Sequence, residues 1–103
     1  MSRPLPIEVT DLAKAQIRAA EEWWRLNRPK APDAIREDLE RASALIAIQP
    51  EIGARATNVS LNGVRRLHLE RVRYYVYYRV AADPGRVEIL AFWHTSRGRI
   101  PSL

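Results

Sequence analysis

Hydrophobic residues recur along residues 12–26 at the three- and four-residue spacing of a helix that has one apolar face. Two adjacent stripes make up this face: Leu12, Gln16, Ala19, Trp23 and Leu26, and beside them Ala13, Ile17, Ala20 and Trp24. Thr10 suits the N-cap position, because its hydroxyl can accept a free backbone N–H, and Asp11 suits the first turn. Pro29 has no amide hydrogen, so we predict that the helix ends within residues 27–29.

The helical spacing returns after Pro32, a residue that favours the first turn of a helix. The apolar positions of this second segment are Ile35, Leu39, Ala42, Leu45 and Ile46. Pro50 predicts its end. Two amphipathic helices joined by a short linker form a helical hairpin, and its apolar side has to be covered by another element.

The second half of the chain alternates with a period of two residues, which predicts β-strands. The longest alternation covers residues 72–80. We expect its even positions, Val72, Tyr74, Val76, Tyr78 and Val80, to pack on the helices. The odd positions, Arg73, Tyr75, Tyr77 and Arg79, are then expected to face outward.

Turn signals separate this strand from its neighbours. Asn62 and Gly63 precede a strand over residues 64–69, and Asp83, Pro84 and Gly85 precede a strand over residues 86–94. A short strand is predicted over residues 5–10, and residues 95–103 have no periodicity. The chain is therefore expected to be one α+β domain over residues 1–103. Its N-terminal strand precedes a helical hairpin that packs on one face of a twisted antiparallel sheet of three to four strands.

The composition excludes several classes of site and location. With no cysteine the chain has neither disulfides nor thiolate metal sites, and two histidines without helical spacing do not suggest a metal site. No cofactor is expected, because neither a glycine-rich phosphate loop nor a nucleophile elbow is present. No apolar run is long enough for a signal peptide or a membrane span, so a cytoplasmic protein without a membrane partner is expected.

The formal net charge of +5 is unevenly distributed. From Asn58 onward Glu70, Asp83 and Glu88 are the only acidic residues, whereas this half holds eight arginines. One interpretation of the arginine excess is the codon bias of a GC-rich genome. The other is a functional surface, since arginine suits forked contacts with phosphates and carboxylates. On the second interpretation an anionic partner meets the second half of the chain.

Basic and aromatic side chains are predicted to share the sheet face that points away from the helices. The candidates are Arg66, His68, Arg73, Tyr75, Tyr77, Arg79, Leu90, Phe92 and His94. Such a face suits nucleic acid, and it equally suits a peptide; a third interpretation is that it only covers a thin sheet. In Trp23–Trp24 one indole is expected in the core and the other at the edge of the helix face.

The order of these segments and their amino-acid sequences resemble those of the ParE/RelE superfamily of bacterial toxins, and the ParE branch in particular. The matching stretches are residues 49–53 (QPEIG), 63–67 (GVRRL), 74–80 (YYVYYRV), 87–90 (VEIL) leading to Trp93 and His94, and 101–103 (PSL). The resemblance implies a cytoplasmic toxin of a type II toxin–antitoxin system. Its partner would be a ParD-like antitoxin with an acidic segment that folds on contact.

The resemblance leaves the target open. ParE-like toxins poison DNA gyrase by binding, and the residues assigned to that contact are Arg65, Arg66, Arg73, Arg79, Arg97 and Arg99. RelE-like relatives cut mRNA on the ribosome, and that activity would use His94, Arg73, Arg66 and Tyr75. The residues assigned to the antitoxin are Trp23, Trp24, Tyr75, Tyr77, Leu90 and Phe92.

The gyrase target is favoured over the ribonuclease. Where ribonuclease relatives carry an arginine early in the tyrosine-rich strand this chain has Tyr75, and Arg73 is the nearest substitute. A binding module without toxicity is a further alternative, because one fold can host several functions.

Overall fold

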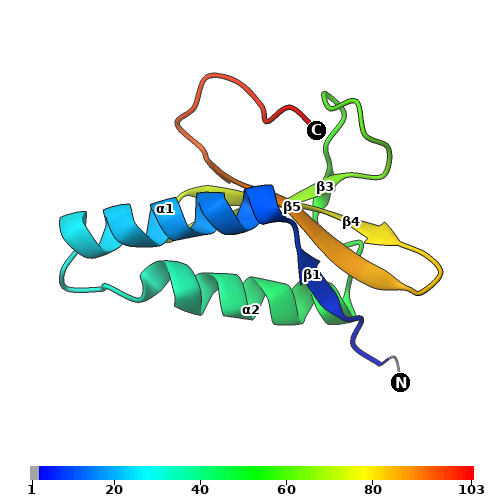
Figure 1. Cartoon of the computed structure of the whole chain (residues 1–103), viewed down its shortest axis with the longest axis horizontal. Coiled ribbons are helices and arrows are strands. Elements are labelled where there is room, and N and C mark those ends of the chain that lie inside the picture. Colours follow the sequence, from blue (N-terminus) through cyan, green and yellow to red (C-terminus); the bar gives the residue numbers. More distant parts are fainter. Residues whose placement is uncertain (1–2) are drawn as a thin grey trace.

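The computed structural model describes residues 3–103 as two helices, a five-stranded sheet and two long loop segments (Figure 1). In chain order the elements are β1 (Ile7–Val9), α1 (Asp11–Asn27), α2 (Ala34–Ile48), β2 (Ala54–Arg55), β3 (Arg65–Leu69), β4 (Tyr74–Ala81) and β5 (Arg86–His94). This arrangement confirms the predicted α+β class, with the N-terminal strand first and the helical hairpin next.

The strand order in the sheet is β1-β5-β4-β3-β2. Four strands are antiparallel neighbours, whereas β1 runs parallel to β5, with Ile7 opposite Val87. The sheet is therefore mixed, and the prediction of three to four antiparallel strands is corrected to five strands with one parallel edge. Parallel pairing needs a long crossover, and the helical hairpin provides part of it.

Local signals set the ends of the helices where they were predicted. The Thr10 hydroxyl accepts the Ala13 N–H at 3.2 Å, and α1 ends at Asn27 where Arg28 donates its N–H to the Trp24 carbonyl. Helix α2 begins two residues after Pro32, but Asp33 does not cap it and pairs instead with exposed Arg36 at 3.3 Å.

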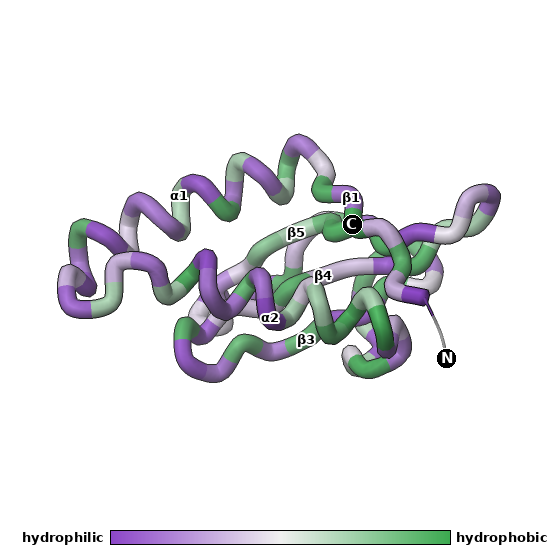
Figure 2. Tube along the Cα trace, turned by 90° about the horizontal axis from the view of Figure 1, so that it is seen from below, coloured by the Kyte–Doolittle hydropathy of each residue, from purple (hydrophilic) through white to green (hydrophobic). Residues whose placement is uncertain are grey.

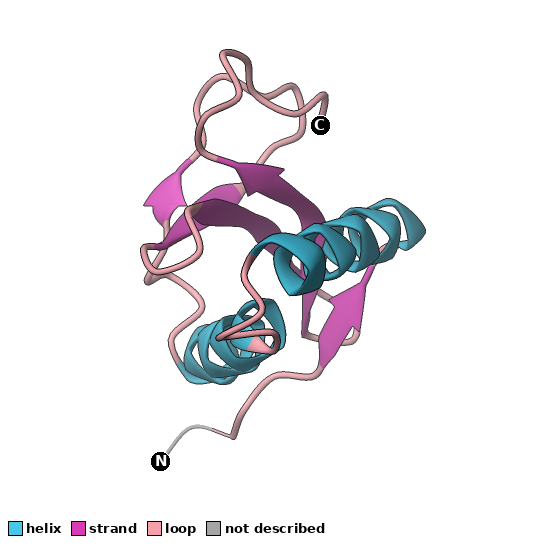
Figure 3. Cartoon of the chain, turned by 90° about the vertical axis from the view of Figure 1, so that its left-hand side faces the viewer, coloured by secondary structure: helices cyan, strands magenta, loops and turns pink. Residues whose placement is uncertain are grey.

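One apolar core lies between the helices and the sheet. Its fully buried members include Ala13, Ile35 and Ile46 from the helices and Val76, Tyr78, Ile89 and Phe92 from the strands. Figure 3 shows both helices on one side of the sheet. Along the tube in Figure 2 hydrophobic and hydrophilic residues alternate on both helices, as their amphipathic patterns require.

A β-bulge in β5 turns the side chains that follow it to the sheet face opposite to the predicted one. Tyr77 lies opposite Ala91 while Tyr78 lies opposite Ile89, so Leu90 is an extra residue. After an extra residue every following side chain changes faces. Phe92 therefore stacks on Tyr74 on the helix side, at 4.4 Å between ring centroids. The predictions that Phe92 and His94 share the outer face are wrong for this reason, and Trp93 takes that face instead.

The tyrosine-rich strand is shorter than predicted and differs at both ends. Arg73 belongs to the turn before β4, where its φ of 62° is left-handed and its carbonyl accepts the Thr95 N–H. Val80, expected in the core, is 48% exposed. Figure 1 shows the reason, since the β4–β5 hairpin extends past the ends of both helices.

Two loop segments cover the sheet face that points away from the helices (Figure 3). Residues 56–64 and the tail of residues 95–103 meet there, because Ser60 and Leu61 donate their N–H groups to the Leu103 carbonyl oxygen. Beneath them Tyr77 is only 1% exposed, in a second apolar cluster with Val64, Leu90 and Trp93. Tyr77 thus lies on the predicted face, but the prediction that it faces solvent is wrong.

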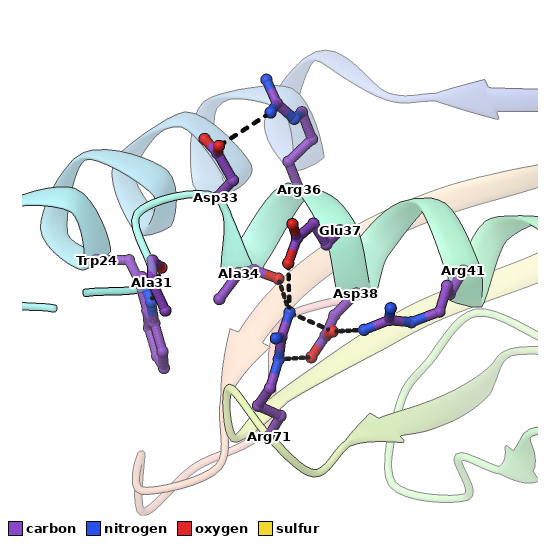
Figure 4. Close-up of polar contacts among 9 residues, drawn as sticks. All are labelled: Trp24, Ala31, Asp33, Ala34, Arg36, Glu37, Asp38, Arg41 and Arg71. Atoms are coloured by element: carbon purple, nitrogen blue, oxygen red, sulfur yellow. Dashed lines mark hydrogen bonds and ion pairs between the residues drawn. The ribbon is translucent and has the colours of Figure 1, made fainter. Parts of the chain in front are cut away.

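An ionic cluster ties α2 to the turn between β3 and β4 (Figure 4). Asp38 is buried and accepts hydrogen bonds from Arg71 at 2.8 and 3.2 Å, and it also contacts Arg41. Arg71 donates further to the Ala34 carbonyl and to Glu37, both at 3.1 Å. The hydrogen bonds to Asp38 and Glu37 raise the pKa of Arg71, so its guanidinium keeps its positive charge beside the two carboxylates.

Candidate functional site

A cleft of about 270 Å³ opens on the sheet face opposite the helices, where β3, β4 and β5 meet the tail. We call it the basic cleft. Its lining consists of Arg66, Tyr75, Tyr77, Trp93, His94, Thr95, Arg97, Gly98, Arg99 and Ile100. Three of these residues are arginines and none is acidic, so the cleft concentrates positive potential.

One wall of the basic cleft comes from β3 and β4, whose register sets Arg66 opposite Tyr77. The Arg66 guanidinium lies 4.3 Å from the centroid of the Tyr75 ring and donates to the Tyr77 hydroxyl at 3.4 Å. The hydrogen bond with Tyr77 raises the pKa of Arg66 against the opposing effect of burial. A charged group therefore lies over an aromatic ring, an arrangement that a cation–π attraction stabilises.

The opposite wall forms where β5 passes into the tail. The Arg97 guanidinium lies 4.1 Å from the centroid of the Trp93 ring, and that of Arg99 lies 5.7 Å from it. The Trp93 indole donates its N–H to the Arg99 carbonyl at 2.9 Å. Trp93 therefore fixes the tail segment that carries the two arginines, whose own side chains are exposed.

The arginines of the second half of the chain differ in whether they already have partners. Arg79 pairs with Glu88 at 2.7 Å, and this hydrogen bond lowers the pKa of Glu88. Arg86 pairs with Glu8 and Glu88. Arg65 is held by backbone oxygens, since it donates to the Gly53 and Glu51 carbonyls. These side chains stabilise the fold.

The arginines of the basic cleft are available for an external partner. Among residues 3–103 Arg66, Arg97 and Arg99 form no ion pair with a carboxylate. Of the six arginines predicted to bind the target, these three converge on the cleft. Arg65 and Arg79 are engaged within the fold, and Arg73 is exposed at its turn outside the cleft lining.

His94 borders the basic cleft but its ring is turned toward the helix side. The imidazole meets Tyr74 edge-on at 4.9 Å between centroids. Its Nδ1 accepts the Ser96 backbone N–H at 3.0 Å and lies 2.7 Å from the Ser96 hydroxyl. In a neutral imidazole that accepts at Nδ1, the hydrogen is on Nε2, so the lone pair of the ring points at the Ser96 N–H and not into the cleft. The geometry does not present His94 as a general base.

His68 lies on the outer sheet face beside Tyr75, with 5.2 Å between ring centroids. It is exposed and lines a neighbouring groove between α2 and β3, together with Leu45 and Leu67. Within the described residues no group of three or more histidine, aspartate or glutamate side chains is placed to hold a metal ion. Over the same residues neither helix combines the length and the apolar content needed to cross a bilayer.

The helical hairpin presents a second candidate surface. Trp24 is half-buried and donates its indole N–H to the Ala31 carbonyl at 2.8 Å, whereas Trp23 is 48% exposed. Leu12 and Leu26 belong to the same stripe as Trp23 and are 54% and 75% exposed. The stripe with Ala13 and Ala20 enters the core. Of the other stripe, Leu12, Trp23 and Leu26 face solvent, whereas Gln16 turns toward the sheet and accepts the Phe92 N–H at 2.8 Å.

The residues assigned to the antitoxin also divide into buried and exposed ones. Tyr77, Leu90 and Phe92 are buried in the fold, so their side chains offer an antitoxin little surface. Trp23 is exposed and Tyr75 partly so. Trp93 was missed as a cleft residue. The alternation that put Leu90, Phe92 and His94 on the outer face leaves Trp93 on the helix side, and no residue pattern marks the bulge at Leu90.

The sequence matches the family model described as the ParE toxin of the type II toxin–antitoxin system parDE, over residues 7–99. Among solved structures it is similar to a chain of the chromosomal ParDE toxin–antitoxin system from P. aeruginosa. That match has a TM-score of 0.71 and 23% identity, and it covers 92% of this chain and 100% of the other. No curated protein sequence gave a match.

Proposed function

The chain belongs to the ParE toxin family of type II toxin–antitoxin systems, and on that premise we propose that it arrests growth by binding DNA gyrase. A toxin of such a system has an antitoxin partner. The proposed action requires a surface that binds a large anionic assembly and requires no catalytic group. We place it in the cytoplasm, where gyrase works on DNA.

The state of His94 supports binding over RNA cleavage. Cleavage without a metal ion needs a group that takes a proton from the ribose hydroxyl. The Nδ1 atom of His94 is already occupied by the Ser96 N–H at 3.0 Å. The basic cleft therefore offers cations and aromatic rings without a base aimed at the same space.

The unpaired arginines of the cleft support an anionic target. Arg66, Arg97 and Arg99 lie on opposite walls of one cleft, and each is held against an aromatic ring. Arginines fixed in this way lose little side-chain freedom when they bind, which favours affinity. We propose that this cleft is the surface that meets the gyrase–DNA complex.

A supercoiling assay tests the target. Full-length toxin, freed from its antitoxin and refolded, should inhibit the supercoiling of relaxed plasmid by purified gyrase. Adding the antitoxin back should restore supercoiling. A folded toxin that arrests growth in cells but leaves gyrase fully active in this assay would rule gyrase out.

A ribosome-dependent RNA endonuclease remains the second candidate, because His68, Tyr75 and Arg66 lie side by side on one face. Primer extension on a translated message would then show cuts within codons that His68→Ala abolishes. Intact message during growth arrest would exclude this activity.

For the antitoxin we propose a ParD-like protein whose acidic segment lies against the exposed stripe of α1. Trp23 is the largest apolar side chain of that stripe, and Arg28 lies 5.4 Å from its ring. An acidic amphipathic segment complements an apolar stripe with a cation beside it. Tyr75, at the edge of the basic cleft, is the second proposed contact.

A further inference from the structure

Because the proposed target works on DNA, we propose that the basic cleft itself binds a single-stranded nucleic-acid segment. Phosphate groups would lie at Arg66, Arg97 and Arg99, and bases would stack on the Tyr75 ring and on the guanidinium planes. This inference rests on the proposed function but concerns the DNA in the gyrase complex and not the gyrase protein.

The charge of the cleft suits phosphate groups. A phosphodiester bears one negative charge and bare oxygens, and a guanidinium binds two such oxygens at once. The three cleft arginines make no ion pair within residues 3–103. No acidic side chain lines the cleft, so a phosphate entering it meets no repulsion.

The aromatic rings of the cleft suit the stacking of bases. Tyr75 is partly exposed and Arg66 lies over it at 4.3 Å, while Arg97 lies over Trp93 at 4.1 Å. Bases of a single strand stack on aromatic side chains and on arginine planes whatever their sequence. Each wall of the cleft thus pairs a cation with a flat ring, as each nucleotide pairs a phosphate with a flat base.

The path continues beyond the cleft. Arg66 and Tyr77 also line a smaller pocket of about 70 Å³, whose other side consists of Arg55, Thr57, Asn58 and neighbouring residues. This pocket likewise has no acidic lining residue. A strand that runs from Trp93 past Arg66 would therefore meet polar and basic groups along its length.

Two other ligands fit less well. A duplex keeps its bases stacked inside, so it would use the arginines but not the rings. An acidic peptide brings carboxylates without flat rings beside them. The pairing of ring and cation on both walls therefore favours a single strand.

Fluorescence anisotropy of the full-length toxin with a labelled oligothymidylate tests the inference. Neutralising three phosphates of a single strand predicts a plot of log affinity against log salt with a slope of about −2. Arg66→Ala and Arg97→Ala should each make this slope shallower by about 0.7. Tyr75→Ala should weaken binding by at least about fivefold, whereas Tyr75→Phe keeps the ring and should stay within about twofold.

Arg25→Ala is the matched control, since it removes one exposed arginine from α1 on the other side of the sheet. It should leave both affinity and slope unchanged. Circular dichroism of every variant shows whether it has folded.

Several results would overturn the inference. They are the absence of oligothymidylate binding, a slope unaffected by Arg66→Ala and Arg97→Ala, and equally good displacement by a duplex or by oligoglutamate. Gyrase inhibition without strand binding would also overturn it and leave the proposed target intact. Strand binding without gyrase inhibition would support it and reject that target.

Discussion

Gly53 occupies a position that has no room for a side chain. A Cβ atom there would lie 2.7 Å from the Tyr78 hydroxyl and 2.8 Å from the Arg66 carbonyl oxygen. The same Tyr78 hydroxyl accepts the Gly53 N–H and donates to the Pro50 carbonyl, both at 2.8 Å. These contacts fix residues 50–53 onto β4 and explain why a glycine ends this segment.

Gly53→Ala is therefore expected to lower the free energy of unfolding by about 1–3 kcal/mol, because the new methyl group pushes the Tyr78 hydroxyl away from both partners. Gly98→Ala is the control, since no atom lies within 4 Å of its Cβ position. Urea denaturation measures both variants. An equal effect of the two substitutions would contradict the packing around Gly53.

Two tyrosines, the buried Tyr78 and the partly buried Tyr74, predict how stability depends on alkaline pH. Burial raises the pKa of Tyr74 and of Tyr78 above the ordinary value of 10.0. The unfolded chain then loses phenol protons at a lower pH than the folded chain does. The contribution of these protonated phenols to the free energy of unfolding is thus complete below the pKa that they have in the unfolded chain. It is lost as the pH rises through the higher pKa that they have in the folded chain.

The free energy of unfolding should accordingly fall as the pH rises above about 10. Tyr78→Phe should lower stability at every pH but make this decline less steep. Urea titrations at increasing pH, with tyrosinate absorbance as the independent measure of ionisation, test the sign. A free energy of unfolding that increases in this range would contradict it.

Helix α2 is joined to the sheet by the cluster around Asp38, which no sequence pattern predicted. Asp38 sits on the inner side of α2, and Arg71 reaches it from the turn between β3 and β4 (Figure 4). Asp38 and Arg71 are 33 positions apart in the chain, so no local sequence pattern indicates that they pair. The sequence held one indication of the cluster, because Asp38 is a charged residue on the helix side that packs on the sheet.

Asp38→Asn should lower the free energy of unfolding by about 1–3 kcal/mol, since it leaves Arg71 and Arg41 without their shared carboxylate. Asp33→Asn removes the same charge from an exposed pair with Arg36 and should cost less than about 0.5 kcal/mol. Chemical denaturation distinguishes the two. A loss at Asp33 as large as that at Asp38 would disprove the special role of the buried cluster.

The exposed stripe of α1 yields a prediction about the antitoxin. Trp23→Ala should weaken antitoxin binding by about tenfold or more while changing stability little, because the indole is half-exposed and packs on no core residue. Trp24→Ala should instead lower the free energy of unfolding by about 2 kcal/mol. Calorimetric titration with the antitoxin tests the first effect, and unchanged affinity of Trp23→Ala would remove the stripe from the interface.

Local patterns sufficed for most elements of this fold. Thr10, Pro29 and Pro32 set the helix ends. The alternation of valine and tyrosine predicted β4 and the helix-facing side of Tyr74, Val76 and Tyr78, but not the exposure of Val80. The parallel pairing of β1 with β5 and the bulge at Leu90 were not predictable, because both depend on contacts between distant segments. The bulge alone accounts for the wrong facing of Phe92, Trp93 and His94.

At the scale of the whole molecule the sheet is a middle layer between the helices and the two loop segments (Figure 3). The tail returns over the outer face and is held there by Trp93 and by the Leu103 carbonyl. A segment without periodicity thus completes the basic cleft. The alternation placed Arg66 and Tyr75 on this face, and the resemblance assigned Arg97 and Arg99 to the same target contact as Arg66. Since residues 95–103 have no periodicity, the sequence did not indicate on which side of the sheet those two arginines lie.

The most direct test compares gyrase inhibition by three forms of the toxin in one supercoiling assay. The double variant Arg66→Ala/Arg97→Ala should need at least about tenfold more protein than the wild type for half-maximal inhibition, because it loses a cation from each wall of the basic cleft. Arg25→Ala should match the wild type. Equal inhibition by the folded double variant and the wild type would contradict the assignment of the cleft as the functional surface.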